Sequence, residues 1–239
     1  MGTTRSAARL IRPVARQHGP VLASTFVRQA LETAVDGLGP LKGAAAAADA
    51  KLEKHDGDRA KAMSELVDGH VSLAGAQGFL TNLGGLLAMS VTVPANISGL
   101  AIVQSHMVGG IAHLRGYDLA DPRVRNAVLA CMLGSDTVAA LIKARKLPSS
   151  PMAIATAPAH DPDLDLEISS HVAAELLERI VAKRSFAAVG RKIPVFGGTV
   201  GLVSDGYATF QVGRYAAREL RSRHADPAGS RPGSTAGTR

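Results

Sequence analysis

Two histidines and one aspartate have the residue types and the spacing with which this chain could do chemistry. His106 and His113 are seven residues apart, so a helix would present both on one face. Asp205 is the only acid between Lys192 and Glu219, and it stands among glycines and apolar residues. The three side chains together could bind a metal ion or relay a proton. Because no HxxxH or HExxH spacing and no further ligand accompany them, we predict no metal site and interpret the histidines as hydrogen-bonded groups of a helical core.

Other motifs that resemble catalytic or cofactor sites lack the residues that the chemistry needs. Gly197–Gly201 (GGTVG) would cradle a phosphate only if Lys and then Ser or Thr followed, and Leu202 and Val203 follow instead. The alternating acids of DPDLDLE (161–167) lack the central glycine and the final glutamate of an EF-hand loop. Cys131 lies in the apolar run AVLACML, which is typical of a small buried side chain. We therefore predict no cofactor and no catalytic residue, and we expect the protein not to be an enzyme.

The composition favours a helical protein that meets an acidic partner. Hydrophobic residues make up 46% of the 239 residues and aromatic residues only 3%, so Ala, Leu, Val and Gly must fill the interior. Small side chains of this kind suit closely packed helices better than a β-sandwich. The net charge of +7 suits an anionic membrane surface or a nucleic acid. We predict no nucleic-acid partner, because zinc-finger spacing and aromatic side chains for base stacking are missing.

The longest uncharged stretch of the chain, Gly69–Leu114, is suited either to the core of a protein or to a lipid bilayer. It contains no Asp, Glu, Lys or Arg, and Pro94 divides it into segments 71–93 and 95–114. Each segment has the length of a bilayer crossing, about 20 residues. Polar side chains such as Gln104 argue against ordinary lipid-facing spans, because each would need a partner in hydrocarbon. The stretch therefore predicts a helical hairpin, either buried at the centre of a helical protein or entering a lipid bilayer.

Capping residues predict where several helices begin and end. Asp58 and Asp121, the latter followed by proline, are expected to cap helices, and Ser135 to cap another. Gly116 can end the helix before it in a left-handed conformation. A second glycine-rich apolar hairpin is predicted over residues 193–213, as the packing partner of the first.

Changes in composition along the chain predict its domain organisation. Residues 1–20 read as a basic N-terminal segment and residues 225–239 as a disordered tail. A helical domain occupies residues 21–224, with a linker loop at 147–166 that holds four prolines and no helical period. The fold class that we predict is all-α, a helical bundle built around two glycine-rich apolar hairpins.

Three blocks of the chain together resemble the EcsC family of bacterial proteins. Residues 74–125 are similar to its glycine-rich segment, its Pro-Ala-Asp step and its YGYDL-x-DP turn, which read here as PAN and RGYDLADP. Residues 191–219 are similar to its closing IPxxGxxxGxxxN segment, and residues 176–190 to the basic helix before it. The chain departs from the pattern at Asn96, where the family has an acid, and at Asp205, where it has Asn.

The resemblance implies a helical, membrane-associated protein and a set of candidate binding residues. The family is named for a gene beside an ABC-transporter operon, which implies a role accessory to transport or secretion. The candidate binding residues combine motif positions with polar groups of the apolar segments: Pro94, Asn96, His106, Tyr117, Asp118, Gly197, Gly201 and Asp205.

Three hypotheses about function stay open at this point. The first is a non-enzymatic protein at the inner face of the cell membrane, which binds an anionic membrane surface or lipid and serves a transporter or another protein partner. A single cysteine and the lack of a recognisable secretory signal favour this cytoplasmic side. The second is a soluble helical protein that binds a lipid or another apolar ligand between its hairpins. The third is a hydrolase-type enzyme, which requires His106, His113 and Asp205 to converge in one cleft.

Overall fold

A computed structural model describes three segments of the backbone, residues 23–83, 89–189 and 194–223. Side chains are described over residues 23–76, 99–179 and 204–223. The predicted basic segment 1–20 and the predicted tail 225–239 lie outside the described residues.

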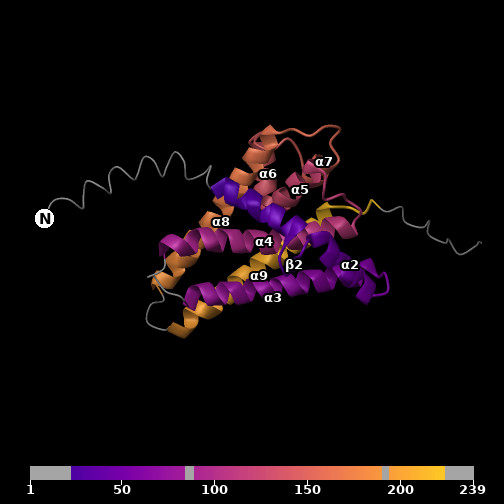
Figure 1. Cartoon of the computed structure of the whole chain (residues 1–239). Helices are drawn as coiled ribbons and strands as arrows, with labels where there is room; N and C mark the ends of the chain where they lie inside the picture. Colours follow the sequence, from indigo (N-terminus) through magenta and orange to yellow (C-terminus); the bar gives the residue numbers. More distant parts are fainter. Residues whose placement is uncertain (1–22, 84–88, 190–193, 224–239) are drawn as a thin grey trace, which may run out of the picture.

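Helices account for almost all of the described chain, which confirms the all-α prediction (Figure 1). The first helix covers residues 23–36. The elements that follow are β1 (Gly37–Leu38), β2 (Leu41–Lys42), α2 (Ala44–Lys54), α3 (Arg59–Leu83), α4 (Met89–Leu114), α5 (Pro122–Met132), α6 (Gly134–Lys143), α7 (Pro151–Ala155), α8 (Asp163–Val189) and α9 (Pro194–Glu219).

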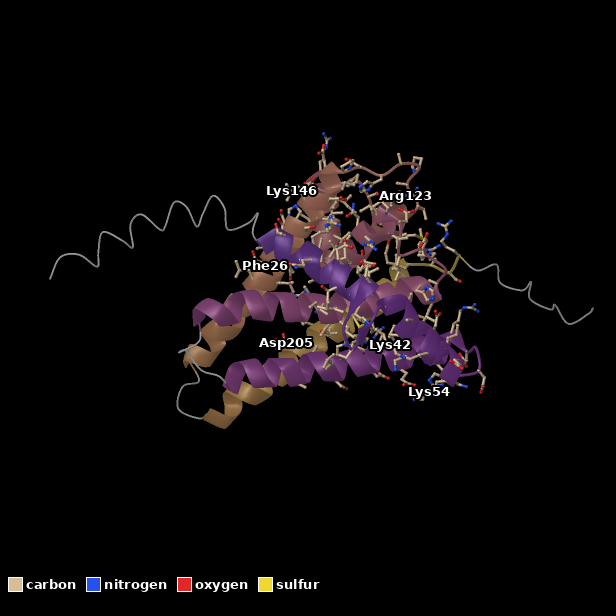
Figure 2. All side chains as sticks on the ribbon, viewed as in Figure 1. Phe26, Lys42, Lys54, Arg123, Lys146 and Asp205 are labelled. Atoms are coloured by element: carbon tan, nitrogen blue, oxygen red, sulfur yellow. The ribbon has the colours of Figure 1, made fainter. Side chains whose placement is uncertain are left out.

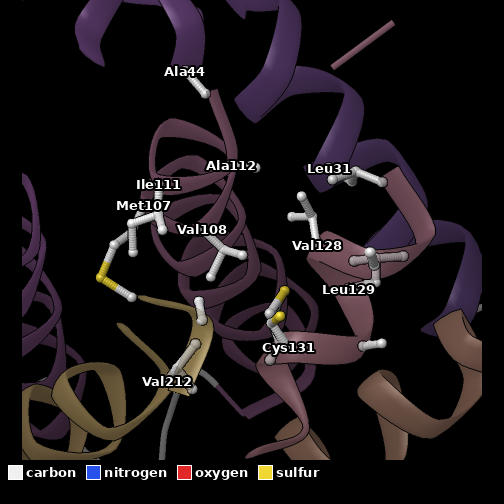
Figure 3. Packing of buried hydrophobic residues seen from close by; sticks show 14 of the residues in the cluster. Leu31, Ala44, Met107, Val108, Ile111, Ala112, Val128, Leu129, Cys131 and Val212 are labelled. Atoms are coloured by element: carbon white, nitrogen blue, oxygen red, sulfur yellow. The ribbon is translucent and has the colours of Figure 1, made fainter. Parts of the chain in front are cut away.

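The second half of α4 forms the centre of the hydrophobic core. Met107, Val108 and Ile111 of this helix have no exposed surface. In Figure 3, α4 lies between α5, which contributes Leu129, and α9, which contributes Val212. This half of the uncharged stretch is therefore buried at the centre of a helical protein, which is the first of the two predicted alternatives. The core also includes Cys131, whose predicted burial is confirmed.

The predicted second hairpin over residues 193–213 is instead one continuous helix, α9. Its predicted role as the packing partner of the first hairpin is confirmed, because α9 lies along α3 and also contacts α4. The contact is close at Gly213, where a Cβ atom would lie 3.1 Å from Met107 Sδ and 3.2 Å from both methyl groups of Val67. Gly213 is thus a position where three helices, α3, α4 and α9, approach one another.

The predicted break of the first hairpin at Pro94 is also wrong. Residues 71–114 do form two packed helices, α3 and α4, but α4 begins at Met89 and continues through Pro94. A proline removes one backbone N–H from the helix and disfavours the preceding turn. Only about one turn of α4 stands before Pro94, so the chain reverses earlier, between Leu83 and Met89, and the helix accommodates the proline near its start.

Two of the predicted helix caps are confirmed and one is not. The side chain of Asp58 accepts hydrogen bonds from the backbone N–H groups of residues 60 and 61, at 3.0 and 3.1 Å. Asp121 accepts from the backbone N–H of Arg123 at 2.9 Å and stands before Pro122. Ser135 does not cap α6, because the helix begins one residue earlier, directly after Leu133, and has no side-chain cap.

Two connections contain more structure than the sequence indicated. Residues 37–42, which include the sequence GLGP, form a tight antiparallel hairpin in which Leu38 pairs with Leu41, and positive φ angles at Gly37 and Gly39 make it feasible. The loop predicted at 147–166 contains the short helix α7 and the first residues of α8. A proline stands at the first position of α7, where its missing N–H costs no helical hydrogen bond.

We expect the mutation Gly213→Ala to lower the free energy of unfolding by about 1–3 kcal/mol, because the added methyl group would press on Val67 and Met107 in a tightly packed core. Gly69→Ala is the matched control. It places the same methyl group on α3 with nothing within 4 Å, and we expect it to stabilise the protein by up to about 1 kcal/mol. Urea denaturation measures both; equal effects would contradict the close approach of α9.

Candidate functional site

The turn at residues 116–122 organises the polar end of the body. Gly116 adopts φ +85°, which ends α4 in the left-handed conformation that the sequence predicted. The backbone N–H of Tyr117 then donates to the carbonyl oxygen of Ala112 at 3.0 Å. The side chain of Asp118 accepts from the backbone N–H of Ala120 at 2.9 Å. The turn therefore places Tyr117 inward, with 4% of its surface exposed, and leaves Asp118 on the surface.

Two grooves adjoin this turn, and Tyr117 and Asp118 line both of them. The larger, with a volume of about 640 Å³, lies between the turn, α2 and the end of the helix over residues 23–36. Leu52 and Leu114 are among its apolar lining residues. The smaller, of about 270 Å³, lies between the turn and the end of α7. Two candidate residues predicted from the sequence, Tyr117 and Asp118, thus line two surface grooves.

Several charged groups around the larger groove form ion pairs or hydrogen bonds with one another. His113 Nε2 lies 2.7 Å from Asp49 Oδ1, and Arg125 donates to Glu32 and, at 3.0 Å, to Asp36. These pairs hold together segments that are far apart in sequence, namely the first helix, α2, α4 and α5. The side chains beside the groove therefore serve the packing of helices.

The ring of Tyr117 is covered from the other side by an arginine. The guanidinium carbon of Arg223 lies 5.6 Å from the ring centroid, in the geometry of a cation–π contact. The backbone N–H of Arg223 donates to the carbonyl oxygen of Arg115 at 2.7 Å. Burial raises the pKa of Tyr117 above its usual value, so the phenol is neutral at physiological pH. Tyr117 therefore acts as a neutral, hydrophobic anchor of the turn.

A second polar group is a pair of stacked histidines from two neighbouring helices. His70 Nε2 of α3 and His106 Nδ1 of α4 lie 2.8 Å apart, and the ring centroids 5.0 Å apart. The outer nitrogen of His70 faces the carbonyl oxygen of Leu66 at 2.6 Å. The outer nitrogen of His106 faces the carbonyl oxygen of Lys42, in β2, at 2.9 Å. The pair thus connects the β-hairpin to the core.

The number of protons on the histidine pair is smaller than the number of its polar contacts. Burial lowers the pKa of His70 to about 4 and lowers the pKa of His106, so both rings are neutral at pH 7. Two neutral rings carry two N–H groups, and each carbonyl oxygen requires one of them. The 2.8 Å contact between the rings then joins two lone pairs and becomes a hydrogen bond only when the pair takes up a third proton.

A third polar group lies between α4 and α9. Gln104 Nε2 donates to Thr209 Oγ1 at 3.2 Å, and both residues have no exposed surface. Gln104 Oε1 has no hydrogen-bond partner among the described residues. Asp205 lies one turn before Thr209 on α9 and is 5% exposed; Figure 2 shows it between α3 and α4. Asp205, which stands among glycines and apolar residues in the sequence, is thus buried.

A comparison with protein families shows to which family this chain is related. The sequence model of the EcsC protein family matches residues 22–224. This chain belongs to the EcsC family. The resemblance seen in its sequence is thereby confirmed, and the match extends it to the first helix, the β-hairpin and α2. No curated protein and no solved structure matches the chain.

In this EcsC-family chain, the two histidines of the hydrolase hypothesis have separate surroundings. His106 contacts His70 and the β-hairpin, whereas His113 contacts Asp49 at the surface. The two histidines are about 10 Å apart along α4, since seven residues separate them. No group of three potential metal ligands occurs among the described residues.

Four further residues predicted for the site of this EcsC-family protein lie outside the part of the chain whose side chains the structure describes. They are Pro94, Asn96, Gly197 and Gly201. The sequence reasoning overlooked His70 and Thr209, which form the polar contacts of His106 and Gln104. Both could have been recognised in the sequence, because each is a polar residue among the apolar residues of a predicted helix.

The described helices of this EcsC-family chain were also compared with the requirements of a membrane span. No single one is long and apolar enough to cross a bilayer. Only α5 and α6 meet the requirement, and only as a pair bent by 110°. Most of α5 is buried in the core of the protein.

We expect acid to weaken this EcsC-family fold through the histidine pair. His70 binds a proton near pH 6.5 in the unfolded chain and near pH 4 in the folded one. Between these values the unfolded state holds more protons, so the free energy of unfolding falls as pH falls from 6.5 to 4. The expected contribution is about 2 kcal/mol, because part of His70 contacts solvent.

Urea denaturation at several pH values measures this dependence in the unmodified protein and in His70→Gln. The variant should lose the part of the slope between pH 6.5 and 4, whereas the surface control His171→Gln should keep it. An unchanged slope in His70→Gln would contradict the neutral, buried state of the pair.

Proposed function

We propose that this EcsC-family protein is a non-enzymatic accessory protein that attaches to the inner face of the cell membrane. The attachment uses the end of the molecule at which α3 and α8 end and α4 and α9 begin, which we call the distal end. Figure 1 shows these four helix ends together at the left, away from α2 and α7. An anionic membrane surface is the partner, and a transporter or another membrane protein is the component that the attachment serves.

The observation that carries the proposal is the charge of the sequences that meet at the distal end. The chain that reaches the distal end through α3 and leaves it through α4 contains no charged residue between Asp68 and Arg115. The chain that reaches the distal end through α8 and leaves it through α9 contains no acid between Glu178 and Asp205. Its cations beyond the ion pair of Arg179 with Glu175 are Lys183, Arg184, Arg191 and Lys192.

Apolar residues and cations without acids near them in sequence are together suited to the surface of an anionic bilayer. Each cation close to such a surface contributes about 1 kcal/mol of attraction. Apolar side chains beside the cations can enter the headgroup region, and the two contributions add. The other end of the molecule contrasts with this composition, since α2 carries both Lys54 and Glu53 and its lysines bind Glu65 of α3.

The alternatives receive less support from the described side chains. The grooves beside Tyr117 are open to solvent and lie at the turn after α4, whereas the second hypothesis requires a ligand enclosed between the apolar helical segments. His106 and His113 occupy separate hydrogen bonds, which does not suit a shared acid–base role.

Vesicle flotation tests the proposal. We expect the protein to float with vesicles that contain an anionic phospholipid and to remain unbound with zwitterionic vesicles. The triple variant Lys183→Glu, Arg184→Glu, Lys192→Glu should bind the anionic vesicles more than about 100-fold more weakly, because losing three cations alone costs about 1 kcal/mol each and the anionic surface repels the introduced carboxylates.

The matched control reverses three cations far from the distal end, in Lys143→Glu, Arg145→Glu, Lys146→Glu. Lys146 is labelled at the top of Figure 2. The control changes the net charge by the same amount and should bind nearly as well as the unmodified protein. Failure of the unmodified protein to bind anionic vesicles, or equal losses in the two triple variants, would overturn the proposal.

A further inference from the structure

We infer that the outer face of α9 is a second contact with the membrane, at which arginines bind the phosphate groups of anionic lipids and lay the helix along the bilayer surface. This inference rests on the proposed membrane attachment and specifies its partner chemistry and the orientation of the protein.

The outward side chains of α9 form one continuous face. Tyr207, Gln211, Arg214 and Arg218 are spaced by four, three and four residues, which places them on one side of a helix. All four are exposed, and Tyr207 has 62% of its surface in contact with solvent. Arg221 is also exposed and follows just after the end of the helix.

The opposite face of α9 is buried, so the orientation of the helix is fixed. Thr209, Val212, Ala216 and Leu220 are at most 2% exposed and face α3, α4 and the rest of the core. Gly213 fixes the closest approach, since a Cβ atom there would touch Met107 and Val67. Rotation of α9 would bury arginines and expose this apolar face, so the arginines point outward in every well-packed arrangement.

The arginines of the face are available for an external anion. No carboxylate of the described residues forms an ion pair with Arg214, Arg218 or Arg221. The nearest acid in sequence, Glu219, turns to another side and accepts a hydrogen bond from the backbone N–H of Met152 at 3.3 Å. Arginine binds phosphate oxygens with two parallel N–H donors, which suits lipid headgroups.

The order of residues along the face favours a lipid bilayer over a nucleic acid. Tyr207 stands nearer the distal end, and the arginines follow toward the body. Tyrosine is enriched at the depth of lipid headgroups, where its ring is in an apolar region and its hydroxyl group is in water. The hydroxyl oxygen of Tyr207 already accepts a hydrogen bond from Gln211 Nε2 at 2.7 Å, which orients the ring along the face. A nucleic-acid duplex would use the arginines, but its bases are paired and stacked on one another and offer no face on which Tyr207 could stack.

The outer face of α9 and the distal end can contact the same membrane surface. α9 begins at the distal end and is about 39 Å long, at 1.5 Å per residue. A protein whose distal end touches the membrane therefore needs only a tilt toward this side to bring the arginines to the surface. The two contacts together would select one orientation of the molecule on the membrane.

Vesicle flotation with Arg214→Gln, Arg218→Gln, Arg221→Gln tests the inference. Glutamine keeps the helix propensity of arginine at the two helical positions and removes the charge. We expect on the order of 100-fold weaker binding to anionic vesicles, because three cations near the surface contribute about 1 kcal/mol each. The control Lys143→Gln, Arg145→Gln, Lys146→Gln should bind within about threefold of the unmodified protein, because these cations do not face the surface. The variant Arg214→Lys, Arg218→Lys, Arg221→Lys should retain most of the binding, because it keeps the charge.

The outcomes separate the inference from the proposed function. If the unmodified protein binds anionic vesicles and the α9 variant binds equally well, the α9 face is not a membrane contact, and attachment through the distal end stands. If the unmodified protein does not bind anionic vesicles, both fail. If the α9 variant loses binding to a DNA or RNA duplex and keeps binding to vesicles, the face serves a nucleic acid and the inference is overturned.

Discussion

The close approach of α9 to α3 and α4 is the constraint on which the rest of the structure depends. Gly213 permits it, because Val67 and Met107 occupy the space in which any larger side chain would stand. Burial of this contact fixes the rotation of α9, and the rotation determines that Tyr207 and Arg214 face outward. The surface properties of the helix are therefore a consequence of its packing.

The same packing explains how a long uncharged segment is accommodated. The second half of α4 is covered by α2, α3, α5 and α9, and its buried residues His106 and Gln104 bind partners on neighbouring helices. His106 holds the β-hairpin through the carbonyl oxygen of Lys42, and Gln104 binds Thr209 of α9. The first half of α4 extends with α3 to the distal end, where the proposed function places lipid.

Local features of the fold could be predicted from the sequence because their causes are local. Asp58 and Asp121 cap helices through N–H groups two or three residues away, and Gly116 ends α4 by its own φ angle. The position of Pro94 and the continuity of α9 could not be predicted, because they depend on packing between helices. Glycine has the same sequence signal in a turn and in a close helix contact. The site was predicted in part, since Tyr117 and Asp118 were found from a local motif, whereas His70 is brought to His106 only by the pairing of α3 with α4.

The depth of a spin label on membrane-bound protein tests the central claim, contact of the distal end with lipid, most directly. Cys131 is buried and burial raises the pKa of its thiol, so a cysteine introduced at the surface can be labelled selectively. Leu86→Cys places a nitroxide at the distal end by sequence, and Lys146→Cys places one on the far side of the body. On anionic vesicles, we expect the label at position 86 to gain collisions with oxygen and lose collisions with a water-soluble nickel chelate, while the label at 146 stays unchanged. Equal access of the nickel chelate to position 86 in solution and on vesicles would contradict the account.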